Sequence, residues 1–198
     1  MLPVRKSIGG LGNLLFKQAY IYAQMRRGEI PDIYVQSEKY WKDYAEEIKQ
    51  LYATDVETTD MVSLHIRRGD YLDTDFYVDL TKTDYYKKAT DMFPNDKFLV
   101  FYKDRQNEDR DEEDRKWVEN FLDEMVPDRW DHCISESETD DLNKMASCKS
   151  NIGSNSSFSW WGCYLNQNSR KVCVMPSEDK WFTDGFQRID LLDEWVKV

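Results

Sequence analysis

Two adjacent arginines stand at the end of a short apolar run, and their side chains are the best suited to chemistry in this chain. Residues 61–66 predict a buried strand, and the segment HIRRGDY at residues 65–71 carries Arg67 and Arg68 past its end. Gly69 permits a tight turn directly afterwards. A guanidinium group is a planar fork of donors that matches phosphate oxygens. The pair therefore predicts an anion pocket; the alternative is two surface arginines paired with neighbouring acidic side chains.

A run of small hydroxyl side chains, SNSSFSWWG at residues 154–162, follows a second predicted strand and begins a predicted helix. The first turn of a helix leaves backbone N–H groups unpaired and its dipole favours negative charge, so this run also predicts phosphate binding. Helix capping is the simpler interpretation, but a cap needs only one serine. Four serines and an asparagine within six residues exceed that need. We expect Trp160 and Trp161 to pack rather than to bind.

A glycine-rich turn at residues 9–13 precedes a helix with an apolar stripe and is the third candidate. It is not a complete dinucleotide fingerprint, because Leu15 stands where GxGxxG requires its last glycine. Taken alone, the simpler interpretation of this segment is an ordinary tight turn.

Metal ligands are not predicted. The triplet DTD at residues 73–75 has the spacing of a DxD metal site, but a chain with 38 acidic residues contains such triplets by chance. The four cysteines show no CxxC spacing, so we expect no zinc site and four free, buried thiols at Cys133, Cys148, Cys163 and Cys173.

From residue 60 onward, predicted strands alternate with predicted helices. The strands are expected at residues 61–66, 97–102, 132–134, 151–153 and 171–175, and the helices at 84–92, 106–126, 140–148, 157–167 and 190–196. Two earlier helices are expected, after the glycine-rich turn and at residues 37–53, and Asp84 is expected to cap the helix that follows it. The alternation implies an α/β fold with a mostly parallel, Rossmann-like sheet, in which ligands bind beyond the carboxyl ends of the strands.

Composition narrows the class of protein further. The 198 residues allow one domain or two small ones, and the net charge of −11 disfavours nucleic-acid binding, which needs a basic face. The sequence contains no apolar stretch of the roughly 18–20 residues that a transmembrane helix needs. It begins with no recognisable signal peptide, so we expect a cytoplasmic protein.

Together these segments resemble the α-1,2-fucosyltransferase family of inverting, GDP-fucose-dependent enzymes. The family's GGLGNQ-F-x-x-A resembles residues 9–16 with Ala19, and its HxRRGDY is matched throughout by residues 65–71. Its NSTFSWW segment resembles residues 155–161, and its closing Pro and Trp-Phe pattern resembles Pro176 followed by residues 181–182. Three departures stand out: Leu14 replaces a glutamine, YKD at 102–104 replaces Ser-Asp-Asp, and only about 50 residues separate the glycine turn from HIRRGDY, where the family usually has over a hundred.

The resemblance implies a GT-B-like fold with one Rossmann-like domain and a reduced N-terminal domain. Residues 59–198 are then the domain that binds the nucleotide sugar. Residues 1–58 are a shortened acceptor-side segment that carries the glycine-rich turn.

The resemblance also implies residue roles. Arg67 stabilises the β-phosphate as negative charge develops on it. Asp73 or Asp75 follows the arginine turn closely enough to act as the general base for the acceptor hydroxyl, and we expect Asp75 to take this role. Arg68 orients the loop through Asp70 or contacts the nucleotide, and Asp141, 16 residues before Ser157, recognises guanine. The full donor-binding set is Gly10, Gly12, Asn13, His65, Arg68, Asp70, Asp141, Asn155, Ser156, Ser157, Phe158 and Ser159. The family requires no metal or other cofactor.

Two alternatives stay open on the sequence. The donor motifs are expected to contact the diphosphate and the guanine rather than the sugar. Another GDP-deoxysugar, such as GDP-rhamnose, therefore fits these motifs as well as GDP-fucose does. A non-catalytic protein that binds a GDP-sugar or a glycan is the alternative from a different class. It predicts GDP binding without transfer to any glycan acceptor.

Overall fold

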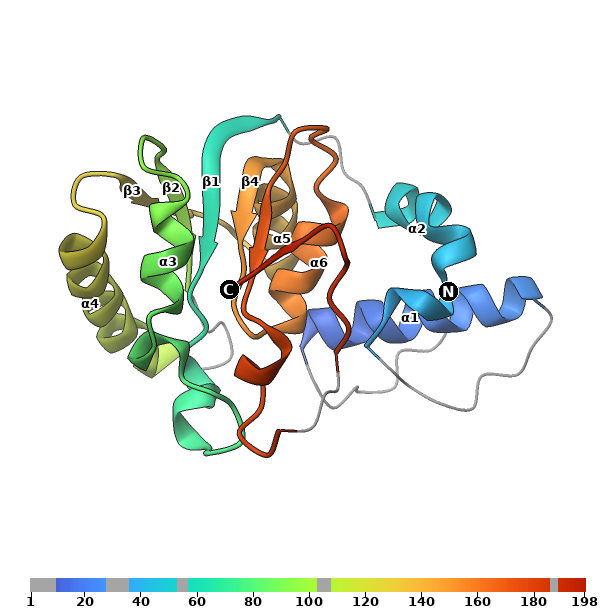
Figure 1. Cartoon of the computed structure of the whole chain (residues 1–198), viewed down its shortest axis with the longest axis horizontal. Helices are drawn as coiled ribbons and strands as arrows, with labels where there is room; N and C mark the ends of the chain where they lie inside the picture. The colour runs from blue at the N-terminus through green and yellow to red at the C-terminus, as the bar shows by residue number, and fades with distance from the viewer. Residues whose placement is uncertain (1–9, 28–35, 53–56, 103–107, 186–188) are drawn as a thin grey trace.

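The computed structural model describes residues 10–27, 36–52, 57–102, 108–185 and 189–198. They form an α/β protein built on one six-stranded sheet (Figure 1). The strands are β1 (Thr59–His65), β2 (Phe98–Phe101), β3 (Trp130–His132), β4 (Cys148–Ile152), β5 (Cys173–Met175) and β6 (Val196–Lys197). Their order across the sheet is β3-β2-β1-β4-β5-β6, and every neighbouring pair is parallel. The predicted Rossmann-like parallel sheet is therefore confirmed.

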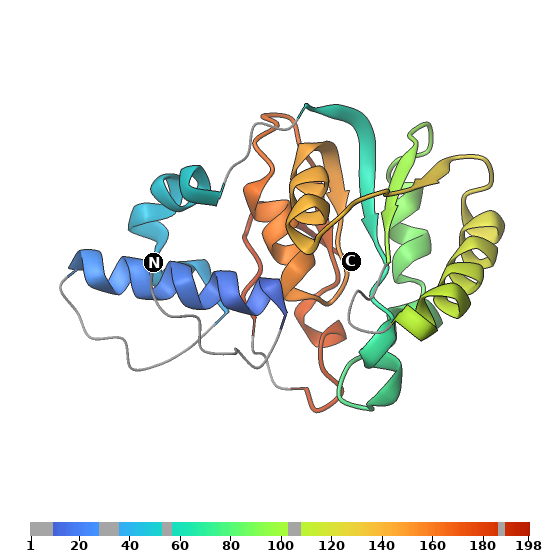
Figure 2. The ribbon, with the colours of Figure 1, turned by 180° about the vertical axis from the view of Figure 1, so that it is seen from behind.

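Helices cover both faces of the sheet (Figures 1 and 2). They are α1 (Leu11–Arg27), α2 (Ala45–Tyr52), α3 (Tyr85–Asp91), α4 (Glu108–Met125), α5 (Glu138–Ser147) and α6 (Ser157–Leu165). Helices α3 and α4 pack on one face, whereas α5 and α6 pack on the other, with α1 and α2 against the outside of α6. No helix in the described ranges is both long and apolar enough to cross a bilayer.

The alternation of side chains along β1 separates two cores. Val62 and Leu64 face α3 and α4, in a cluster that includes Tyr85 and Leu122. The opposite face of the strand carries Ser63, whose hydroxyl accepts from the Asn151 amide group on β4, and His65, which bonds with Ser159 on α6.

Aromatic rings fill the core between α1, α2 and α6. The ring of Phe16 lies 4.7 Å from that of Trp160 and 5.3 Å from that of Trp161, measured between centroids. Trp41 stacks on Trp161 with an angle of 10° between the ring planes. Both tryptophans of the predicted helix are fully buried, which confirms that they pack in the core.

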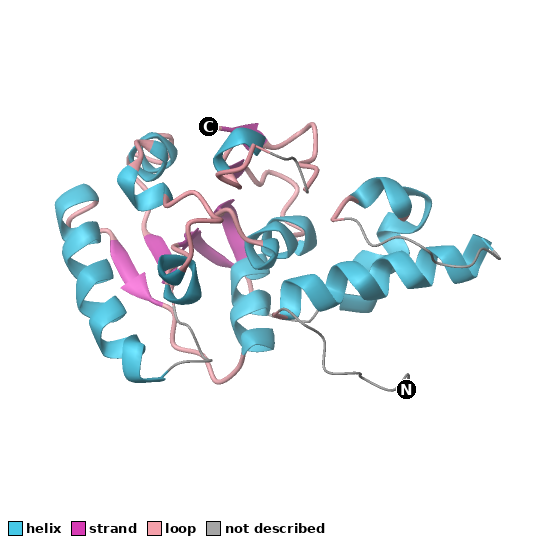
Figure 3. Ribbon diagram, turned by 90° about the horizontal axis from the view of Figure 1, so that it is seen from below, coloured by secondary structure: helices cyan, strands magenta, loops and turns pink. Residues whose placement is uncertain are grey.

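The direction of the chain across the sheet reverses between β1 and β4. From β1 the chain proceeds outward to β2 and β3, and then α5 returns it to β4 on the far side of β1. Ligands of such sheets bind at this reversal, beyond the carboxyl ends of the two strands. Figure 3 looks onto this edge, to which the start of α1 and the short turns η3 (Gly69–Asp73) and η5 (Glu178–Lys180) also come.

One predicted helix is wrong, and another is confirmed only in part. Residues 190–196 form no helix but a short turn that leads into β6, because the open edge of β5 offers backbone partners: the Val198 amide donates to the Met175 carbonyl at 3.0 Å. The helix predicted at residues 37–53 is confirmed only at α2, which is preceded by the turns η1 (Glu38–Tyr40) and η2 (Lys42–Tyr44). Trp41 breaks the helix with φ −134° and ψ 14°, and its buried indole donates to the Tyr164 hydroxyl.

Smaller differences concern boundaries and capping. The third strand lies two residues earlier than predicted, and β4 begins at Cys148 rather than at residue 151. Asp84 precedes α3 but does not cap it with its side chain; it pairs with Lys88 at 2.7 Å, and the Thr83 hydroxyl accepts from the Tyr85 amide instead. The four cysteines are free thiols, as predicted, and only Cys133 is not fully buried. A domain boundary at residue 58 stays a prediction.

Candidate functional site

Strand β1 carries the HIRRGDY segment to the reversal point of the sheet. The Ile66 amide still donates to the Phe101 carbonyl at 2.8 Å, so the sheet holds the chain up to the first arginine. Gly69 then adopts φ +64°, a conformation in which a side chain would be strained, and η3 follows. The predicted tight turn at Gly69 is confirmed.

Arg67 lies over a pair of stacked tyrosines. Its guanidinium carbon is 4.9 Å from the centre of the Tyr71 ring, within the range of a cation–π contact. The Tyr71 ring stacks on Tyr77 at 3.8 Å, and the Tyr71 hydroxyl donates to the Asn155 carbonyl at 3.2 Å. Tyr71 therefore links the arginine turn to the serine-rich segment, which is distant in the sequence.

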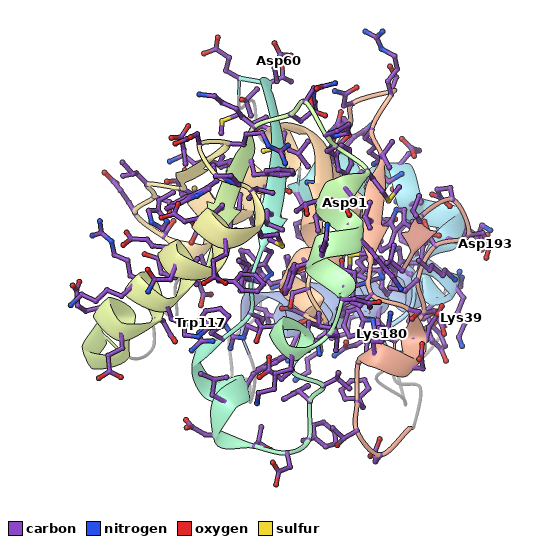
Figure 4. The ribbon with its side chains drawn as sticks, turned by 60° about the vertical axis from the view of Figure 1, so that its left-hand side comes forward. Lys39, Asp60, Asp91, Trp117, Lys180 and Asp193 are labelled. Carbon is purple, nitrogen blue, oxygen red and sulfur yellow. The ribbon has the colours of Figure 1, made fainter. Side chains whose placement is uncertain are left out.

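Arg68 takes a different direction. Its Nε donates to Asp114 Oδ1 at 2.8 Å, and its guanidinium lies 3.8 Å from the ring of Trp117. Figure 4 shows Trp117 on α4 beside the turn that follows β1. The partner of Arg68 is thus on α4, and the side chain of Asp70 lies outside the described residues.

The serine-rich segment crosses from β4 into α6. The Ser156 hydroxyl caps α6 by accepting from the Phe158 amide at 3.3 Å, and the half-buried Ser157 is the first residue of the helix. The Asn155 amide group donates to the Val78 carbonyl at 2.8 Å, so this buried side chain anchors the segment. The amino end of α6 therefore lies at the reversal point, with its dipole suited to an anion.

The amino ends of α1 and α6 touch each other at Gly12. The helix begins at Leu11, so Gly12 and Asn13 belong to its first turn rather than to the predicted loop. A Cβ on Gly12 would lie 2.6 Å from both the Ser157 hydroxyl and the Phe158 amide nitrogen. Asn13 Oδ1 accepts from Gln36 at 2.7 Å, which holds the segment that begins at residue 36 on α1. Two motifs from opposite ends of the chain thus meet at one point.

We expect Gly12→Ala to destabilise the protein by about 1–3 kcal/mol, because the added methyl group overlaps α6 backbone atoms that cannot move freely. Gly10→Ala is the matched control: Gly10 is exposed, and a Cβ there meets nothing within 4 Å. Urea unfolding of both variants measures the difference. Equal stabilities of the two variants would contradict the close approach of α1 to α6.

His65 joins β1 to α6 from within the core. Its Nδ1 forms a hydrogen bond with the hydroxyl of Ser159, which also accepts from the Ser154 amide at 2.9 Å. Only 6% of His65 is exposed. Burial, and secondarily the charge of Arg67, lower the pKa of His65 to about 3. The imidazole is therefore neutral at physiological pH, and its predicted contact with the nucleotide stays a prediction.

The low pKa of His65 predicts acid sensitivity. The unfolded chain takes up a proton at this histidine below pH 6.5, whereas the folded protein does not until about pH 3. Stability attributable to His65 is therefore complete above pH 6.5 and is lost as the pH falls, by about 2 kcal/mol at pH 5. We expect His65→Gln to flatten the fall in urea midpoint between pH 7 and pH 5. His132→Gln, which removes the other histidine, is the control, and an unchanged slope in His65→Gln would contradict the assignment.

Asp75 lies on an exposed stretch beside the tyrosine pair. Its backbone carbonyl accepts from the Thr183 hydroxyl, and the next residues pair with the chain after η5 through a bridge between Tyr77 and Phe182. This pairing holds residues 75–77 near the stacked rings below Arg67. The role of Asp75 as a base stays a prediction.

Asp141 lies in the first turn of α5, where its Oδ1 accepts from the Ser135 hydroxyl. Helix α5 packs against α6, and its first turn follows β3 in the chain. Recognition of guanine by Asp141 stays a prediction.

The site combines one arginine with the amino ends of two helices at a single edge of the sheet. Such an arrangement can bind a diphosphate and stabilise the negative charge that develops when a bond to it breaks. In the ranges that the structure describes, no three His, Cys, Asp or Glu side chains gather closely enough to hold a metal ion.

Sequence reasoning missed three residues of this site. Tyr77 is identified only through its stacking on Tyr71, and nothing in the sequence marks that pairing. Asp114 lies in the charged run at residues 108–116, which predicts a solvated helix face, and Trp117 directly follows that run. Neither residue indicates its partner, Arg68.

Comparison with known proteins yields one family and two relatives. The profile of glycosyl transferase family 11 matches residues 20–198. The O-antigen biosynthesis glycosyltransferase WbnK of Escherichia coli is 31% identical over 150 residues, which are 72% of this chain and 46% of that protein. An alpha-1,2-colitosyltransferase of Escherichia coli is 27% identical over 191 residues, 82% of this chain and 60% of that protein. The chain thus spans about half the length of these relatives, and no solved structure matches significantly.

Proposed function

The chain belongs to glycosyl transferase family 11. We propose that it transfers a 6-deoxyhexose from a GDP-sugar to a hydroxyl group of a glycan, and that this sugar is fucose. The observation that carries the proposal is that the turn with Arg67 and the touching amino ends of α1 and α6 lie at one edge of the sheet, where the Tyr71 hydroxyl links the turn to the Asn155 carbonyl. A nucleoside diphosphate is the leaving group that this arrangement suits best.

In the proposed reaction the acceptor hydroxyl attacks the anomeric carbon of the sugar from the face opposite the diphosphate. The new bond to the acceptor oxygen forms as the bond to the diphosphate oxygen breaks, so the configuration inverts and GDP leaves. Arg67 and the first-turn amides of α6 stabilise the charge that accumulates on the β-phosphate. Asp75 accepts the proton of the acceptor hydroxyl.

We propose that the reaction needs no metal. Arg67 and the two helix amino ends supply the positive potential that a divalent cation supplies to the diphosphate in other transferases. Transfer is therefore expected to proceed at the same rate in EDTA as in Mn²⁺.

The sugar and the linkage are the finer parts of the proposal. One relative is named for α-1,2 transfer of a colitosyl group, which supports an α-1,2 linkage and a family in which the transferred sugar varies. GDP-fucose is the first donor to test, with other GDP-deoxysugars as the alternatives.

A transfer assay tests the proposal. The chain is incubated with GDP-fucose or GDP-rhamnose and a panel of galactose-terminated glycans in EDTA, and the products are analysed by mass and by NMR of the new anomeric centre. We expect release of GDP together with a fucosylated product of α configuration. GDP binding without transfer to any acceptor would instead favour a non-catalytic binding protein.

A further inference from the structure

The two adjacent arginines at the end of β1 have separate environments. Arg67 is half-buried over the Tyr71 ring, at the edge where the donor is proposed to bind. The side chain of Arg68 is only 11% exposed and lies against α4, where its Nε donates to Asp114 Oδ1 at 2.8 Å. Adjacent residues at the end of an extended strand diverge in this way because their side chains leave the backbone on opposite sides.

Helix α4 presents two groups to Arg68 from one face. Asp114 and Trp117 are three residues apart, so they lie one above the other on the helix. The guanidinium is held at its edge by the carboxylate and on its plane by the indole ring, 3.8 Å away. The Asp114 side chain is 5% exposed, whereas Glu112, Glu113 and the other described acidic residues of α4 are at the surface or half-buried.

Stability alone does not account for this pair. The free energy needed to remove two charges from water is about as large as the free energy of their attraction, unless all their hydrogen bonds are made. A protein with an apolar pair of similar size in their place is often at least as stable. Asp114 Oδ2 is buried and has no hydrogen-bond partner among the residues that the structure describes. The pair therefore adds little to the stability of the fold, and its effect is to fix the position of the Arg68 side chain against α4.

The position of Arg68 affects Arg67 because the backbone is anchored both before and after Arg67. Before it, the Ile66 amide is fixed to β2 by its bond to the Phe101 carbonyl. After it, the Arg68 side chain is fixed to α4, and the Tyr71 hydroxyl is fixed to the Asn155 carbonyl. Between these anchors, Gly69 turns the chain with φ +64°.

We propose that Asp114, supported by Trp117, is a positioning residue for the transfer reaction. By holding Arg68 against α4, Asp114 sets the course of the turn and thereby the placement of the Arg67 guanidinium against the β-phosphate. Arg68 accordingly serves as an anchor rather than as a ligand of the nucleotide. This inference rests on the proposed function, in which Arg67 contacts the diphosphate.

Three variants separate positioning from stability. Asp114→Ala leaves the buried Arg68 charge without its partner. The double variant Arg68→Met/Asp114→Leu removes both charges and keeps the volume of the pair. Lys116→Met/Glu112→Leu is the matched control, because it removes an ion pair of the same helix in which both side chains are about two-thirds exposed. Each variant is examined by urea unfolding, by the kcat and donor KM of transfer, and by hydrogen exchange of the amides at residues 69–71.

We expect Asp114→Ala to be the least stable and the double variant to recover most of the lost stability. The kcat of the double variant is nevertheless expected to be about 10- to 100-fold lower, because small displacements of a group that stabilises the transition state are costly. Exchange of the turn amides is expected to be about tenfold faster or more, and the control is expected to match the wild type. If the double variant does not fold, Asp114→Asn, which keeps an acceptor for Arg68, is expected to show a smaller change in the same direction.

A folded double variant, or a folded Asp114→Asn, with wild-type kcat and wild-type exchange would overturn the inference, because the pair would then be only structural. The exchange measurement needs no substrate. If the wild-type protein transfers no sugar, the proposed function fails, while exchange at residues 69–71 still decides whether Asp114 orders the turn.

Discussion

Arg67→Ala is expected to lower the rate of sugar transfer about 10³-fold while the protein stays folded. Negative charge moves onto the β-phosphate as the glycosidic bond breaks, and a guanidinium aimed at that charge stabilises the transition state more than the bound donor. Arginines in comparable positions of phosphoryl-transfer enzymes contribute effects of about this size. The cation–π contact with Tyr71 contributes about 1–2 kcal/mol to stability, so the variant is expected to fold.

The measurement is kcat and KM for donor and acceptor, with unfolding by urea as the check on folding. Arg67→Lys keeps the charge but not the planar fork, and an intermediate rate is expected for it. Arg170→Ala, at an exposed arginine in the turn between α6 and β5, is the control and is expected to match the wild type. Transfer by Arg67→Ala within a few-fold of the wild-type rate would exclude the diphosphate role.

Asp75→Asn is expected to lower kcat about 10²-fold with little change in donor KM. A carboxylate that takes the proton from the attacking hydroxyl contributes an effect of at least this order, and the amide cannot take that proton. The substitution preserves the size of an exposed side chain, so no loss of stability is expected.

Asp73→Asn is the discriminating control, because Asp73 is a second exposed carboxylate in the same segment. It is expected to stay within about twofold of the wild-type rate, as surface substitutions usually do when they touch neither the core nor the reacting atoms. A larger loss in Asp73→Asn than in Asp75→Asn would transfer the role of the base to Asp73. Full activity in both would mean that the electrophilic sugar needs no base.

The sheet, and the position of the arginine and serine motifs at one of its edges, were predictable because apolar runs and hydroxyl-rich turns are local signals. Residues 97–102 and 171–175 contain strands that are buried on both faces. The sequences of such strands are continuous apolar runs, which can be recognised without knowledge of the residues packed around them. Since parallel strands bring their carboxyl ends to one edge, the motifs after β1 and β4 had to come close together.

The parts that were not predictable depend on partners distant in the sequence. Leu191 and Trp195 are both buried and have helical spacing, yet this segment forms a turn and then a strand on the open edge of β5. Asp114 resembles its exposed neighbours on α4, and only the position of Arg68 in the folded chain distinguishes it. Trp41 interrupts a helical pattern because its ring is needed in the core against Trp161. Tertiary packing overrides local preference in each of these cases.

Titration calorimetry of the wild-type protein and Arg67→Ala with GDP and UDP, each in EDTA and in Mn²⁺, tests the central claim most directly. The account predicts that the wild type binds GDP in EDTA, prefers it to UDP, and gains nothing from Mn²⁺. It predicts that Arg67→Ala binds GDP about 10- to 100-fold more weakly, because a charge-assisted contact with the diphosphate is lost. Binding that requires Mn²⁺, equal affinity for UDP, or an unchanged affinity in Arg67→Ala would contradict a diphosphate site built on Arg67.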